Sequence, residues 1–474
     1  MIVKLNNKNL FYETEKIIRL FLPFEKILFN KEINDDRALF IEINNIICVK
    51  LLLNGKEQTH TTNFESNLEV NLLKAVFLCF VNLCGYKPDW GILTGIRPTR
   101  LWLSFIEKLS EDETYRIFKE DYLLNDKKIN LLNQTAKNEQ EIISLSKANS
   151  ASLYVSIPFC PSKCAYCSFV SDATDKAAKL KPIYVEKLIE ELKEISLYSK
   201  NLNLNIETVY IGGGTPSTLS PKELDLLLSS IYKFFNLKNL REFTVEAGRA
   251  DSINKEKLKA IYPYADRICI NPQTLNNNVL AACKRNHTKE EFIKVFLKAK
   301  EMGFKNINCD LIAGLPEDTE QSFENSIKEL ISLDPEGITV HTLSLKRAAN
   351  LYKNAYYEFE EGKTVSNMTY KAYDMLKLAG YIPYYLYRQS KTIGNLENIG
   401  YSKPKYKGYY NVYIMDETHT ILGAGAGAVT KLKNQKTNRI ERIFNYKFPF
   451  EYISQFDEML RRKQKIGEFY SDKG

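Results

Sequence analysis

The chain lacks a long hydrophobic run, a concentrated basic tract and a supply of histidines. No apolar stretch among its 474 residues approaches the roughly 20 residues needed to span a membrane, and the N-terminal segment lacks a signal-peptide pattern. The net charge is +8, but lysines are spread along the whole chain, which argues against nucleic-acid binding. We therefore expect a cytoplasmic, monomeric protein that binds neither membranes nor nucleic acids.

Cysteine is the residue type whose distribution carries most information. Three of the nine cysteines, Cys160, Cys164 and Cys167, share one short loop with the spacing C-x3-C-x2-C. Three thiolates in such a loop can hold three irons of a [4Fe–4S] cluster and leave the fourth iron open to another ligand. Structural zinc usually requires two separated C-x2-C pairs, and the second pair is absent. The spacing therefore favours an iron–sulfur cluster in a reducing compartment.

Three units are expected along the chain. Residues 1–148 indicate a small α+β domain, residues 149–345 alternate strand and helix patterns, and residues 346–474 indicate a further α/β unit. The alternation in the middle unit predicts a parallel sheet with outer helices. Its strands are expected at residues 153–156, 208–211, 242–246, 267–271, 306–312 and 338–343. Ligands of such sheets gather where the strands end, so these positions supply the candidate site residues.

Several candidate ligand-binding residues stand at those strand ends. The run Gly212-Gly213-Gly214-Thr215 would let a ligand approach the backbone closely, although a tight turn is the simpler explanation for a glycine run alone. Glu246 offers a carboxylate that can accept hydrogen bonds from ribose hydroxyls, with an ordinary surface acid as the alternative. The polar residues after the later strands, each with a structural alternative, are Gln273, Arg285 and Asp310.

Taken together, the cysteine loop and the glycine run resemble the signatures of the radical S-adenosylmethionine (SAM) superfamily. The resemblance implies a partial (β/α)6 barrel, here with an N-terminal α+β domain and a C-terminal α/β extension. It also implies two cofactors, a [4Fe–4S] cluster and SAM, which is cleaved to a 5′-deoxyadenosyl radical. An external low-potential electron donor, such as flavodoxin or ferredoxin, is then expected as a partner.

Over roughly residues 150–435, the order and spacing of the motifs resemble the oxygen-independent coproporphyrinogen III oxidase family, and the run from Asp310 to Pro316 is especially typical of it. Segments at 90–100, 340–347 and 387–401 are similar to its HemZ-type branch, assigned as coproporphyrinogen dehydrogenase. The resemblance implies decarboxylation of coproporphyrinogen III to protoporphyrinogen IX, with Tyr154 and Arg285 in catalytic positions. The residues implied at the cofactors are Tyr154, Tyr166, Gly212, Gly213, Gly214, Thr215, Glu246, Gln273, Arg285, Asp310 and Val429.

A tetrapyrrole with several carboxylates requires cationic side chains. Arginine forks match carboxylates, and lysine supplies a point charge. The candidates are Arg97, Arg100, Lys346, Arg347 and Arg388. Ordinary surface salt bridges explain these residues equally well. Near the C-terminus, the glycine-rich run that ends at Val429 resembles a late strand of the family at the cofactor, with a tight backbone crossing as its alternative.

Three positions depart from the pattern of the well-studied oxidase. Phe169 stands in place of a fourth cysteine, Ser156 in place of a histidine, and Asn271 and Pro272 in place of glycine and valine. The related haem-chaperone branch also lacks the fourth cysteine, but its His-Asn-x-x-Tyr-Trp motif is absent here, and the chain has only 4 histidines. A haem-binding, chaperone-like radical SAM protein and a radical SAM enzyme for another tetrapyrrole therefore remain as alternatives.

Overall fold

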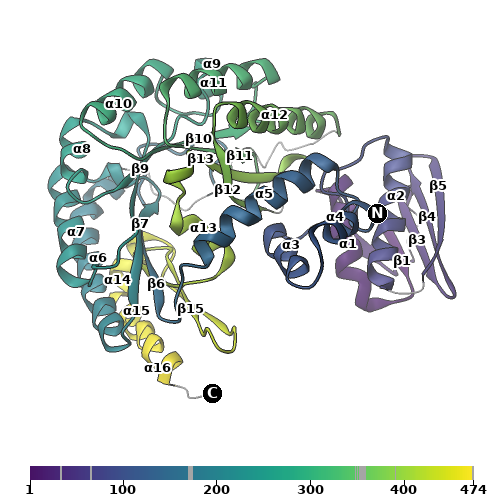
Figure 1. Ribbon diagram of the computed structural model, residues 1–474, viewed down its shortest axis with the longest axis horizontal. Helices are drawn as coiled ribbons and strands as arrows, with labels where there is room; N and C mark the ends of the chain where they lie inside the picture. Colours follow the sequence, from purple (N-terminus) through teal and green to yellow (C-terminus); the bar gives the residue numbers. More distant parts are fainter. Residues whose placement is uncertain are drawn as a thin grey trace.

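Two β-sheets and the helices around them make up the molecule (Figure 1). The structure is a computed structural model, and it describes residues 1–32, 35–64, 67–168, 175–346, 349, 351, 359–389 and 391–471. The smaller sheet belongs to the N-terminal part of the chain, and the larger one contains every strand from residue 150 onward.

The smaller sheet has 5 strands in the order β2-β1-β3-β4-β5. Burial alternates along β4, an interior strand, as expected for a sheet with one face in a core. Helices α1 (Phe11–Phe21) and α2 (Leu68–Cys84) cover that face and share a hydrophobic core with it. The strands are β1 (Ile2–Leu5), β2 (Leu28–Phe29), β3 (Ala38–Ile43), β4 (Ile46–Leu53) and β5 (Lys56–Asn63).

The larger sheet has 11 strands in the order β12-β13-β11-β10-β9-β8-β7-β6-β14-β15-β16. Strands β6 to β11 are parallel neighbours in sequence order, which confirms the predicted succession of βα units. The parallel strands are β6 (Ser150–Ile157), β7 (Asn205–Gly213), β8 (Glu242–Gly248), β9 (Arg267–Ile270), β10 (Ile307–Ala313) and β11 (Gly337–Thr342). They are buried almost throughout, because other elements cover both faces.

The C-terminal part of the chain extends this sheet at both edges. One edge carries β13 antiparallel to β11, followed by β12, and the other carries β14 parallel to β6, followed by β15 and β16. These strands are β12 (Ile382–Arg388), β13 (Glu397–Ser402), β14 (Thr420–Ala424), β15 (Val429–Lys433) and β16 (Ile440–Phe444). In the described part of the chain the sheet is open, as in a partial barrel.

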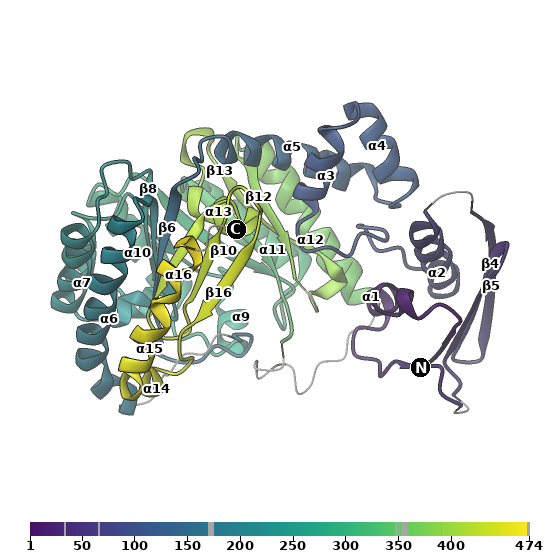
Figure 2. The same ribbon diagram turned by 90° about the horizontal axis from the view of Figure 1, so that it is seen from below.

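Helices cover the outside of the parallel strands (Figures 1 and 2). Their starts are defined locally: Ser220 and Glu223 form a capping box at α7, and Thr288 and Glu291 form another at α10. The helices are α6 (Asp175–Asn201), α7 (Pro221–Phe234), α8 (Lys255–Ile261), α9 (Asn277–Ala282), α10 (Lys289–Glu301), α11 (Glu320–Leu333) and α12 (Phe359–Leu378). The later helices are α13 (Tyr409–Asp416), α14 (Pro449–Ser454), α15 (Phe456–Lys463) and α16 (Lys465–Ser471). No helix within the described ranges has the length and apolar character of a membrane span.

The N-terminal core is smaller than the expected unit of residues 1–148. Ile92 belongs to the core of the smaller sheet, whereas Trp102 and Phe118 belong to the core of the larger one. The connecting helices are α3 (Pro98–Ile106), α4 (Glu111–Glu120) and α5 (Asp126–Ile143). Helix α5 packs along β12, so the two cores separate near residue 92. The sequence does not show this boundary, since amphipathic helices look alike whichever sheet they cover.

Candidate active site

A cavity of about 430 Å³ lies at the carboxyl-terminal side of the parallel strands. Every strand from β6 to β11 contributes to its wall, either directly or through the loop that follows. The predicted residues on the wall are Tyr154, Cys160, Cys164, Tyr166, Cys167, Gly213, Gly214, Thr215, Glu246, Gln273, Arg285, Asp310 and Lys346. The sheet therefore gathers residues that are spread over almost 200 positions of sequence into one site.

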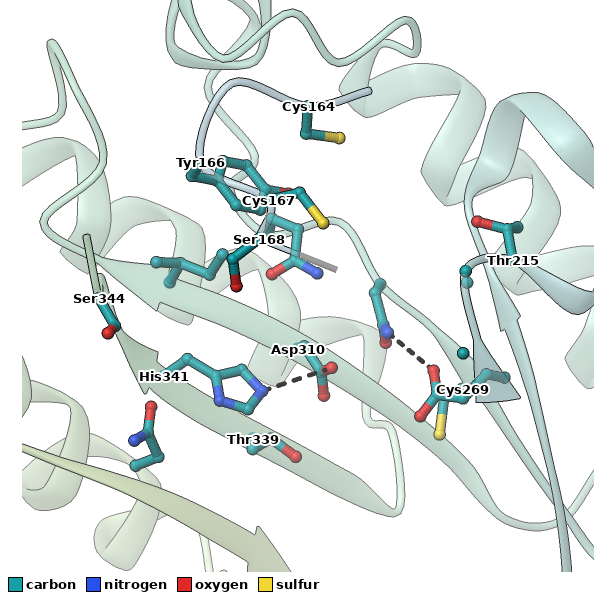
Figure 3. Close-up of a pocket in the computed structure, with 18 of the residues that line it drawn as sticks. Cys164, Tyr166, Cys167, Ser168, Thr215, Cys269, Asp310, Thr339, His341 and Ser344 are labelled. Atoms are coloured by element: carbon teal, nitrogen blue, oxygen red, sulfur yellow. Dashed lines mark hydrogen bonds and ion pairs between the residues drawn. The ribbon is translucent and has the colours of Figure 1, made fainter. Parts of the chain in front are cut away.

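The three cysteines of the loop after β6 are free thiols on this wall. Figure 3 shows Cys164 and Cys167 on one turn of chain above the cavity. Among the described residues, no three Cys, His, Asp or Glu side chains converge around the position of a single metal ion. A [4Fe–4S] cluster does not require such convergence, because each thiolate binds a different iron. The donor set therefore fits a cluster better than a mononuclear metal.

Two arginines face the middle cysteine. Nη1 of Arg249 lies 3.4 Å and Nη1 of Arg285 lies 3.7 Å from Sγ of Cys164. Arg249 is held by a bidentate ion pair with Asp251, with N···O distances of 2.9 and 2.6 Å, and it donates to the carbonyl of Ser162 at 3.0 Å. Both guanidinium groups place positive charge beside a site that would carry the negative charge of a cluster and its thiolates.

The glycines after β7 are required by the protein's own packing. Gly213 has φ +106°, and a Cβ there would lie 2.8 Å from Oγ of Ser156 and 2.9 Å from N of Ile157. A Cβ on Gly214 would lie 2.6 Å from the carbonyl oxygen of Phe159. Gly213 and Gly214 thus allow the end of β7 to pack closely against the backbone at the start of the cysteine loop. Gly212 packs against the ring of Tyr210 and is not part of the wall.

The carboxylate of Glu246 is fixed by two donors. The hydroxyl of Tyr210 donates to Oε1, and Nδ2 of Asn271 donates to Oε2 at 3.1 Å. Burial raises the pKa of Glu246, and the negative charge of Asp310 raises it further. Tyr210 is in turn stacked on Tyr410, with ring centroids 4.5 Å apart. The carboxylate therefore has a defined position on the cavity wall.

Three polar side chains on the wall have buried atoms without a hydrogen-bond partner among the described residues. These atoms are Oε1 of Gln273, Oδ1 of Asn271 and Nε of Arg285. Gln273 has φ +69°, and its backbone exchanges hydrogen bonds of 2.9 Å with Asp310 and Ile312 of β10, which fixes its unusual conformation. Unsatisfied buried polar atoms are costly, so their grouping on one wall fits a polar ligand such as SAM.

Asp310 forms an ion pair with His341, which was not singled out as a site residue from the sequence. Nε2 of His341 lies 3.5 Å from Oδ2 of Asp310, as seen in Figure 3, and Nδ2 of Asn308 donates to Oδ1 at 2.8 Å. Burial alone would raise the pKa of Asp310, but the hydrogen bond and charge of His341 outweigh it and lower that pKa. Burial lowers the pKa of His341, but Asp310 outweighs this effect and raises it.

A sequence signal for His341 exists but is weak. It is paired in register with Ile312 on β10, two positions beyond Asp310, so both side chains point to the same face of the sheet. The residues of the site that sequence reasoning missed include Tyr210, Arg249, Asn271 and His341. Arg249 has no comparable signal, because its contact with the cysteine loop joins residues 85 positions apart.

The predicted substrate cations do not form one set. Lys346 is an exposed side chain on the cavity wall, and Arg347 lies outside the described residues. Arg97 is 2.6 Å from Glu417, which also pairs with other cations, and Arg100 is exposed on α3. These two and Arg388, which is buried at a different cavity, are away from the site. Of the described candidates, Lys346 is therefore the one on the wall of the cysteine cavity, and a substrate role for these cations stays a prediction.

Val429 also lies off the wall, at the start of β15. The glycine-rich segment before it is a close backbone crossing, since a Cβ on Gly423 would lie 2.8 Å from the carbonyl carbon of Val429. A Cβ on Gly425, which has φ +91°, would lie 2.4 Å from the carbonyl oxygen of Ser156. The alternative explanation of this run, tight packing, therefore accounts for its glycines.

Comparisons with known proteins agree with this geometry. A model of the radical SAM superfamily matches residues 154–330. The chain is 40% identical over 429 residues to "Oxygen-independent coproporphyrinogen-III oxidase-like protein HemZ" of Bacillus subtilis (strain 168), covering 87% of this chain and 86% of that protein. It is 36% identical over 205 residues to the heme chaperone HemW of Lactococcus lactis subsp. lactis (strain IL1403), but this match spans only 43% of the chain and 51% of HemW.

A solved structure supports the fold. The coproporphyrinogen III oxidase HemN from Escherichia coli, described as a radical SAM enzyme, superimposes with a TM-score of 0.52 and 20% sequence identity. The superposition covers 68% of this chain and 72% of HemN. At this identity the likeness shows a shared architecture of the parallel sheet and its helices.

Proposed function

The chain belongs to the family of HemZ-type, coproporphyrinogen-III oxidase-like proteins within the radical SAM superfamily, and on that premise we propose that it converts coproporphyrinogen III to protoporphyrinogen IX without oxygen. The cofactors of the superfamily are a [4Fe–4S] cluster and SAM, which together supply a 5′-deoxyadenosyl radical when bound. In the proposed reaction, two propionate side chains each lose a hydrogen atom, one further electron and CO2, and become vinyl groups.

One observation carries the proposal: a single cavity is lined by the three cysteines and by unsatisfied polar atoms suited to SAM. Cys160, Cys164 and Cys167 would hold the cluster. Glu246 and Gln273 would bind SAM through a fixed carboxylate and an unpaired amide oxygen. The side chains that fix these groups do not depend on the ligands, so the site is largely preorganised.

The part of the cavity wall that comes from β12 suits pyrrole rings that carry acidic side chains. Tyr385 and Tyr387 of β12 are stacked on its wall, with ring centroids 6.2 Å apart, and offer faces for pyrrole rings. Lys346, an exposed cation on the same wall, would meet a propionate together with the protonated form of His341. Partial enclosure by these side chains would keep water away from the reacting carbon.

The test is anaerobic turnover with reconstituted protein, SAM, coproporphyrinogen III and a low-potential donor such as flavodoxin or ferredoxin. We expect protoporphyrinogen IX and a mono-vinyl intermediate by chromatography, and neither product with Cys164→Ser as the matched control. Protein that has an intact cluster and cleaves SAM, but forms neither product, would contradict the decarboxylation. Another tetrapyrrole would then be the next substrate to examine.

Haem handling is the second candidate, because relatives such as the L. lactis protein carry the name heme chaperone. His341 lies on the cavity wall and could reach a haem iron there. His419 cannot, since it is buried between Ser152 and Ser146, each 3.0 Å away, and burial lowers its pKa to about 3. A haem titration with a shift of the Soret band that is lost in His341→Ala would favour this candidate over decarboxylation.

A further inference from the structure

A second cavity of about 400 Å³ lies where the N-terminal part of the chain meets the larger sheet. Helix α1 forms one wall, and residues 388–389 and 391–395, which follow the end of β12, form another. Gly362 of α12 also lies on its wall. The cavity is distinct from the cysteine site, but Gln389 lies on the walls of both, so the two cavities adjoin at this residue.

The wall of the second cavity is cationic. Among its described residues it carries no Asp or Glu. Two of its cations, Lys16 and Arg19, are already paired with acids of their own helix, at 2.9 and 2.7 Å. The cationic side chains on the wall are Lys16, Arg19, Arg388 and Lys391. Tyr12 and Tyr86 add aromatic surface, so the lining suits an organic anion better than an inorganic one.

Arg388 is a buried cation on this wall. It is 3% exposed, its Nη1 donates to the carbonyl of Leu93, and its Nη2 donates to the carbonyl of Asn395 at 2.9 Å. In the described structure, its buried Nε and the buried Nδ2 of Asn395 have no acceptor. Burial lowers the pKa of Arg388 to about 10, only partly offset by the charge of Glu397.

Two unsatisfied donors, one of them the Nε of a buried guanidinium, call for an acceptor that carries negative charge. A carboxylate meets both needs, because its two oxygens accept several hydrogen bonds and arginine binds it in a fork. We propose that the second cavity binds a carboxylate group. If the proposed function holds, on which this step rests, the carboxylate is a propionate of the tetrapyrrole in the neighbouring cavity. The N-terminal part of the chain then supplies one wall of the substrate site.

The test uses the full-length chain and coproporphyrin III, the fluorescent oxidised form of the substrate. We expect Arg388→Gln and Lys391→Gln to weaken its binding about ten- to a hundredfold, the usual effect of losing a charge-assisted contact. Arg461→Gln, a change at an exposed arginine of α15, is the control and should bind as the unchanged protein does. If Arg388→Gln fails to fold, Lys391→Gln still tests the site, because this variant keeps Arg388 and its buried hydrogen bonds.

Two further probes separate the sources of the carboxylate. The tetramethyl ester of coproporphyrin III should bind the unchanged protein and both variants equally weakly, if propionates occupy the cavity. Succinate should raise the melting temperature of the unchanged protein, but not of the variants, if the cavity takes a free organic acid instead. Binding of succinate without coproporphyrin III would keep the carboxylate site and refute its use for a propionate of the tetrapyrrole, whereas the decarboxylation itself is tested by the turnover assay. Variants that bind every carboxylate probe as the unchanged protein does would overturn the carboxylate site itself.

Discussion

Replacement of Glu246 by glutamine tests the SAM site most directly. A carboxylate offers about four acceptor positions, and Tyr210 and Asn271 occupy two of them, which leaves about two for ribose hydroxyls. Glutamine exchanges one oxygen for an NH2 group, which cannot accept. The unpaired Oδ1 of Asn271 can receive that NH2 after its amide turns, so we expect the fold to survive. Loss of at least one charge-assisted bond costs about 1.5–3 kcal/mol, or roughly a ten- to hundredfold weaker Kd for SAM.

The assay is equilibrium dialysis of SAM against anaerobically reconstituted protein, with cluster content checked by absorption. Glu290→Gln, at an exposed position of α10, is the matched control. Burial raises the pKa of Glu246. If SAM binds its ionised form, the affinity for SAM should fall as the pH is lowered, and this fall should begin at a higher pH than for a glutamate with an ordinary pKa. Glu246→Gln should lose this pH dependence. Equal Kd values and equal pH profiles for the variant and the unchanged protein would refute the role of Glu246.

Three further predictions follow from other parts of the molecule. Cys164→Ser should lose the visible absorption of the reconstituted cluster together with SAM cleavage; retention of both would contradict the ligand set. Gly213→Val should lower the melting temperature even before any ligand is added, because its Cβ meets backbone and Ser156, whereas Gly95→Ala, with open space around it, should not. Lys463→Met should destabilise the fold by about 3–5 kcal/mol in chemical denaturation, because the buried carboxylate of Glu191, 3.1 Å from Lys463, then lacks its cation. The double variant Lys463→Met/Glu191→Gln should recover much of this loss, and additive losses of the two single variants would refute the pairing.

The sequence by itself determined the parallel architecture and the place of the site. The six predicted strands of the parallel part coincide with β6 to β11, because strand pattern and helix caps are local properties of the chain. The cysteine spacing is also local, since one short loop carries all three thiols. The position of the other site residues follows from topology. In a parallel sheet the carboxyl ends of all strands lie on one side, so Glu246 and Asp310 lie near the cysteine loop.

Only the tertiary structure decided which side chains meet. Cys164 is faced by Arg249 from another loop, and Asp310 is paired with His341 through the register of two strands. Arg388 was a candidate substrate cation from the sequence, but the packing of the N-terminal part against β12 places it in a second cavity. These contacts join residues tens to hundreds of positions apart. They depend on strand register and on which helix covers which sheet, and no local periodicity of the chain records either.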